Sequence, residues 1–101
     1  MLRRQLRAFR FAPRARCWKE SWNDRNVLEV IASDRPGLLA RIGWVLADRD
    51  VRLQNARITT FGERAEDVFF ITDKHNHALA DSAAEQLAAA VEQELTENKA
   101  R

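Results

Sequence analysis

The fold can be predicted outward from residues 27–46, which read V-L-E-V-I-A-S-D-R-P-G-L-L-A-R-I-G-W-V-L. The first part alternates, so Leu28, Val30 and Ala32 share one face of a strand, because successive side chains of a strand point to opposite faces. The second part has helical spacing, with an apolar stripe made of Leu38, Leu39, Ile42, Val45 and Leu46. The stretch therefore predicts a strand, a turn and an amphipathic helix.

The turn between this strand and this helix has chemistry suited to an anion. Asp34 can accept backbone N–H bonds near the helix start, Pro36 fixes φ where no intrahelical donor is needed, and Gly37 permits close approach of backbone or ligand. The free amides and the partial positive charge of the helix N-terminus favour a carboxylate or phosphate. The alternative is an ordinary strand-to-helix turn, which is common.

Length and composition bound the class of protein. The chain has 101 residues and a net charge of +2, which suits one domain with its own core. Cys17 is the only cysteine, so no intrachain disulfide can form, and we expect a reducing, cytoplasmic setting. No apolar run approaches the roughly 20 residues that span a bilayer, so we expect no membrane partner.

The first 16 residues are rich in arginine and precede the first acidic residue, Glu20. The helical spacing of Leu2, Leu6 and Phe9 also occurs in mitochondrial presequences and membrane-surface helices. Clustered arginines can also bind nucleic-acid phosphates, although nothing like a recognition helix follows. We favour a third interpretation, in which residues 1–13 are a basic linker or the tail of a preceding domain.

The remaining segments predict three more strands and a second helix. Residues 15–21 alternate weakly and are expected to form an edge strand that pairs with residues 27–32 as a hairpin. The first helix should run from about Gly37 to Asp48, and Gly43 inside it suggests close packing. Residues 50–60 form a strand whose apolar parity changes, which predicts a β-bulge near Gln54 and Asn55; the alternative is a central strand that is apolar on both faces.

Residues 66–72 should return from this strand as a hairpin, across a loop in which Gly62 suits a positive φ. Phe69 and Ile71 are expected on the same face as Val27 and Ile31. The sheet would then be apolar on both faces, and the face without helices would need a partner domain or subunit.

The last helix should begin at Ser82, with Glu85 completing a capping box, and run to about Leu95. Residues 97–101 are expected to be a disordered tail. The order ββαββα predicts an α+β, ferredoxin-like fold over residues 14–96, with an antiparallel sheet and two helices on one face.

The sequence contains no recognisable catalytic motif, because it has neither a G-x-S-x-G turn nor a phosphate-binding loop. Asp73, His75 and His77 alternate on a polar loop, but three residues without a fourth ligand are a weak metal signal, and we expect no metal. The best candidate site is the helix start, where amides could hold a carboxylate while Asp34 and Asn55 bond an amine or amide. That chemistry fits a free amino acid.

Three segments resemble one known family: D-R-P-G-L-L-A-R-I-G at 34–43, L-Q-N-A-R-I-T-T at 53–60, and G-E-R-A-E-D-V-F-F-I-T-D at 62–73. They are similar to ACT domains, and most similar to the C-terminal ACT domain of bacterial PII uridylyltransferase/uridylyl-removing enzymes. The resemblance covers roughly residues 27–95. It implies a glutamine-sensing regulatory domain at the end of a longer cytosolic enzyme, so Met1 would begin a piece of that chain.

The resemblance also implies which residues bind the ligand. Some residues match the family's ligand loop or its effector-facing strand, and others are their neighbours in sequence. Together they are Asp34, Arg35, Pro36, Gly37, Leu38, Leu39, Gln54 and Asn55. Trp44 departs from the family pattern, since a smaller residue is expected there. The implied partners are L-glutamine or another small amino acid, a second ACT domain or a homodimer, and the parent's catalytic domains.

Those catalytic domains are not in this sequence, so we expect no cofactor here, whereas the parent is expected to need Mg²⁺. One alternative is a domain that pairs without binding a ligand. Another is a nucleic-acid-binding module that uses the arginine-rich segment, which predicts salt-dependent binding.

Overall fold

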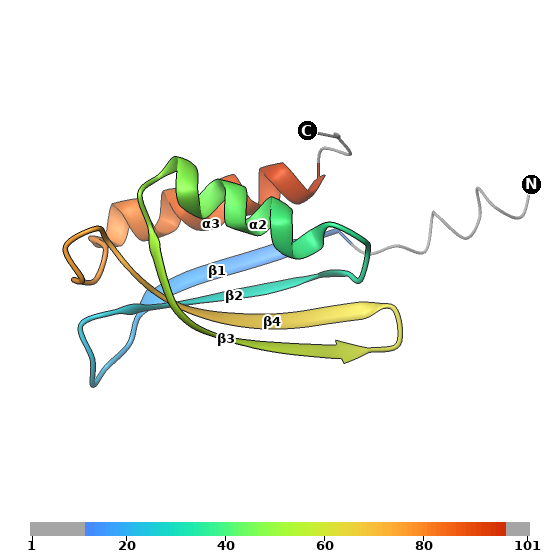
Figure 1. The fold of residues 1–101 in the computed structure, drawn as a ribbon, viewed down its shortest axis with the longest axis horizontal. Helices are drawn as coiled ribbons and strands as arrows, with labels where there is room; N and C mark the ends of the chain where they lie inside the picture. Colours follow the sequence, from blue (N-terminus) through green and yellow to red (C-terminus); the bar gives the residue numbers. More distant parts are fainter. Residues whose placement is uncertain (1–11, 97–101) are drawn as a thin grey trace, which may run out of the picture.

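The computed structural model describes residues 12–96 as a four-stranded sheet with both helices on one face (Figure 1). The elements are β1 (Arg14–Lys19), β2 (Asn26–Ser33), α2 (Leu38–Asp48), β3 (Arg52–Phe61), β4 (Arg64–Thr72) and α3 (Asp81–Thr96). Neighbouring strands are antiparallel, and their order across the sheet is β1-β2-β4-β3. The predicted α+β, ferredoxin-like ββαββα fold is confirmed. The predicted tail, residues 97–101, and residues 1–11 of the predicted linker lie outside the described residues.

The core lies between the sheet and the two helices. Alternation places every second residue of β2 and β4 against the helices, as expected for strands with one covered face. The buried hydrophobic cluster from these two strands consists of Leu28, Val30, Ala32, Ala65, Phe69 and Ile71. The predicted strand face of residues 28, 30 and 32 is therefore confirmed.

The predicted grouping of β4 side chains with those of β2 is wrong. Phe69 and Ile71 were expected on the face of Val27 and Ile31, but Phe69 lies opposite Leu28 in the antiparallel ladder. Residues directly opposite in such a ladder share a face. Phe69 and Ile71 therefore belong to the helix-facing core. The residues that alternate with them along β4 lie on the uncovered face.

The helices follow the predicted spacing with three differences. Leu39 is 48% exposed, so it does not belong to the core stripe of α2. Gly43 is exposed and a Cβ there would meet no atom within 4 Å, so the predicted close packing is wrong. Helix α3 begins at Asp81, which places Ser82 inside the first turn and not at the predicted capping position.

Strand β3 contains the predicted bulge. Its register against β4 shifts between Leu53 and Asn55. The alternative of a central strand is wrong, because β3 lies at the edge of the sheet and all its residues except Ala56 are exposed. The β3–β4 turn contains Gly62 at φ 60°, which confirms the predicted positive φ.

Candidate ligand-binding site

The start of α2 and the neighbouring strands β3 and β4 enclose a pocket of about 370 Å³. This volume lies within the ~300–1,000 Å³ range of small-molecule sites. The pocket is lined by Asp34, Arg35, Gly37, Leu38, Leu39, Ala40, Ile58, Thr60, Ala65 and Asp67. Most of the predicted loop residues are therefore at one pocket, together with four strand residues that the sequence did not single out.

Backbone conformation shapes the loop at the entrance to α2. Gly37 is the N-cap residue with φ 83° and ψ 1°, a left-handed conformation that glycine adopts without a Cβ clash. No side chain of the described residues caps this helix, so the predicted role of Asp34 as an acceptor at the helix start is not observed. Instead, the N–H of Asp34 donates to the carbonyl of Glu63 at 2.7 Å and ties the loop to the β3–β4 turn.

The uncapped helix leaves backbone donors at the pocket. The N–H of Leu38 donates to the carbonyl of Arg35 at 3.2 Å, and that of Arg41 donates to Gly37 at 3.0 Å. Within residues 12–96, the N–H groups of Leu39 and Ala40 have no hydrogen-bond acceptor. Such groups, with the positive end of the helix dipole, favour an anion.

A buried carboxyl group lines the same pocket. Asp67 is only 1% exposed, and its Oδ1 accepts the backbone N–H of Thr59 at a long 3.4 Å. Burial raises the pKa of Asp67, the negative charge of Asp34 raises it further, and the hydrogen bond from Thr59 opposes both. The pocket therefore offers a carboxylate and an anion-binding helix start together.

Sequence reasoning missed Asp67, although a signal was present. On β4 it lies between Ala65 and Phe69 on the helix-facing side, where alternation requires an apolar residue. An acidic residue at such a position breaks a local rule, and broken local rules are expected mainly at functional or strained sites.

Pro36 of the predicted loop does not line this pocket, and neither of the two predicted strand residues is at it. Asn55 lies opposite Phe70 in the ladder, on the sheet face away from the helices, and its Oδ1 accepts the N–H of Ala56 at 2.8 Å. Gln54 is the extra residue of the bulge. A role for either in ligand binding stays a prediction.

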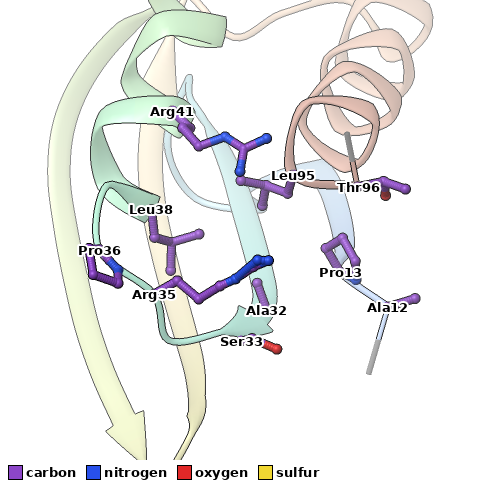
Figure 2. A pocket seen from close by; sticks show the side chains of 10 residues that line it. All are labelled: Ala12, Pro13, Ala32, Ser33, Arg35, Pro36, Leu38, Arg41, Leu95 and Thr96. Atoms are coloured by element: carbon purple, nitrogen blue, oxygen red, sulfur yellow. The ribbon is translucent and has the colours of Figure 1, made fainter. Parts of the chain in front are cut away.

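A second pocket, of about 210 Å³, lies on the other side of the same loop. Figure 2 shows Arg35 and Arg41 extending into it from the loop and from α2, with Pro36 nearby. Arg41 Nε lies 3.4 Å from Glu94 Oε2, and its guanidinium also donates to the Glu94 carbonyl. Arg41 therefore joins α2 to α3 at the wall of this pocket.

The remaining reactive side chains have local explanations. Burial raises the pKa of the Cys17 thiol to about 11, so it stays protonated at neutral pH and is a poor nucleophile. Asp73 Oδ1 accepts the N–H groups of His75 at 2.8 Å and His77 at 3.0 Å, which folds the loop on itself. Residues 12–96 contain no cluster of three or more His, Cys, Asp or Glu side chains able to hold a metal.

Neither described helix is long and apolar enough to cross a membrane.

Comparison with known proteins relates this chain to one family. The family model for the ACT domain matches residues 26–92. A bifunctional uridylyltransferase/uridylyl-removing enzyme of Azotobacter vinelandii is 55% identical over 78 residues, which are 77% of this chain and 9% of that enzyme. The enzyme of the same name from Pseudomonas aeruginosa is 50% identical over 99 residues, 97% of this chain and 11% of the relative. The chain thus spans about a tenth of the length of these relatives, and it belongs to the ACT domain family.

Proposed function

We propose that this chain is the amino-acid-sensing regulatory domain of a longer uridylyltransferase/uridylyl-removing enzyme acting on PII, and that its ligand is L-glutamine. Support comes from the sequence of an enzyme of that name, which is 50% identical to this chain over 97% of the chain's length. In this proposal, other domains of the same cytoplasmic enzyme carry out catalysis with Mg²⁺. This domain regulates them in response to nitrogen status.

The observation that carries the proposal is the pairing of opposite electrostatic features in one pocket. An α-amino acid is a zwitterion, so its site needs an anion-binding group close to a cation-binding group. The uncapped start of α2 supplies the first, and the carboxyl groups of Asp34 and Asp67 supply the second. Leu39 and Ile58 add apolar walls for the aliphatic part of a side chain.

Titration of the 101-residue chain with L-glutamine, followed by NMR at the amides of Gly37, Leu39 and Ala40, tests this proposal. We expect selective, saturable shifts at these amides, with L-glutamate and D-glutamine as control ligands. Flat spectra at millimolar L-glutamine would contradict the proposal.

A second candidate function is pairing without a ligand. It is favoured by the sheet face away from the helices, where Phe70 is only half-buried and Trp18 is 40% exposed. Sedimentation during the same titration separates the candidates. A dimer with flat spectra indicates a pairing module, whereas saturable shifts indicate a sensor whether or not the chain associates.

A further inference from the structure

Asp67 is the charged group most completely removed from solvent in the described chain. It lies opposite Val30 on β2 and Ile58 on β3, within a ladder whose helix-facing positions are otherwise mostly apolar. No ion pair neutralises it within residues 12–96. A buried carboxylate without a cation is unfavourable, so its presence indicates a function.

The carboxyl of Asp67 also has unused acceptor capacity. An ionised carboxylate offers about four lone-pair sites, and the only hydrogen bond to Asp67 from residues 12–96 comes from Thr59 at 3.4 Å. Because Asp67 lines the pocket at α2, a cationic group bound there could use the remaining sites. Asp34 lines the pocket too, but it is exposed, and exposed ion pairs contribute little.

We propose that Asp67 binds the α-ammonium group of the amino acid. The pocket then binds an α-amino acid more tightly than the same acid without its amino group. This inference rests on the amino-acid binding proposed above. The ligand carboxylate then lies toward the free amides of Leu39 and Ala40, which line the same pocket. The buried position strengthens the ion pair, because charges interact more strongly where water is excluded.

The test combines one substitution with one change in the ligand. Asp67→Asn keeps the shape and the acceptor for Thr59 but removes the charge. Glutaramate, which is glutamine with hydrogen in place of the α-amino group, removes the other partner. We expect Asp67→Asn to weaken L-glutamine binding at least tenfold without weakening glutaramate binding, because the charge of Asp67 repels a ligand that carries only a carboxylate. Where glutaramate does not saturate, initial slopes of the NMR shifts give the relative affinities.

Glu66→Gln is the matched control, since it removes a carboxylate one residue away on the other face of β4, and it should bind L-glutamine as the wild type does. Asp67→Asn should fold at least as stably as the wild type, because it removes a buried charge. Unchanged glutamine binding in Asp67→Asn, or an equal loss for both ligands, would overturn the assignment of Asp67 alone. A wild-type chain that binds no α-amino acid would overturn the sensing proposal and this inference together.

Discussion

At the residue scale, the contact between His77 and Asp24 joins the loop after β4 to the loop after β1. His77 Nδ1 lies 2.6 Å from Asp24 Oδ2, and the N–H of Ala78 donates to Asp24 Oδ1 at 2.8 Å. The hydrogen bond and charge of Asp24 raise the pKa of His77. The hydrogen bond from the N–H of Ala78 lowers the pKa of Asp24 most, and the hydrogen bond and charge of His77 lower it further.

These shifts predict a pH-dependent contribution to stability. Because the pKa of His77 is raised in the folded state, its contribution is fully present below the unfolded value of about 6.5 and is lost as pH rises through the folded value. Asp24→Asn should therefore lower the thermal midpoint more at about pH 5.5 than at about pH 8.5. It should also lower the His77 pKa measured by NMR. The same loss of midpoint at both pH values would contradict this account.

At the element scale, the bulge in β3 assigns Asn55 a structural role. The ladder needs an extra residue so that Leu53 and Ala56 can both lie on the helix-facing side, opposite Ile71 and Phe69. The Asn55 side chain satisfies the N–H of Ala56 next to this irregularity. Asn55 therefore stabilises the bend of the strand.

Asn55→Ala should lower the free energy of unfolding by about 0.5 to 1.5 kcal/mol, the usual net value of one hydrogen bond. It should leave the affinity for L-glutamine unchanged, because Asn55 is not at the pocket. Chemical denaturation and the NMR titration measure the two quantities. Gln54→Ala serves as the control and should change neither. Loss of glutamine binding with unchanged stability would place Asn55 in the ligand site after all.

At the scale of the whole molecule, one face of the sheet has no helix over it among residues 12–96 (Figure 1). Val68 lies near the middle of this face, between Glu29 on β2 and Arg57 on β3. Apolar side chains such as Val68 on an uncovered face favour association, and a lysine in place of one of them opposes it.

Val68→Lys should therefore weaken self-association of the chain without unfolding it, since this position faces away from the helices. Sedimentation over a range of concentrations measures the effect. Ala89→Lys adds the same charge at an exposed position of α3 and should associate as the wild type does. Equal association of both variants and the wild type would show that this face is not the interface.

The first strand, β1, belongs to the folded domain although it lies outside the family match. The ACT family match begins at residue 26, yet β1 lies before it, pairs with β2 and packs on α3. The N–H of Ala15 donates to Glu92 Oε2 at 2.8 Å, which fastens this edge strand to the last helix. Residues ahead of the family match are therefore part of the sheet.

The sequence alone determined the features that depend on neighbours along the chain. The alternation at Leu28, Val30 and Ala32, the change of parity that requires the bulge, and the positive φ of Gly62 are all local properties. The motif around Gly37 similarly identified most of the pocket loop, because a strand-to-helix turn is specified within a few residues.

Only the tertiary structure decided which face each strand presents and how much of it is covered. Pairing of β4 with β2 brought Phe69 into the core, and the edge position of β3 left Ile58 exposed beside Leu39 at the pocket. The tertiary structure also buried Asp67 at the pocket and directed Asn55 to the sheet face away from the helices. Local patterns define two faces for each strand, but burial and charge environment come from segments distant in sequence, and these exist only once the sheet and helices have packed.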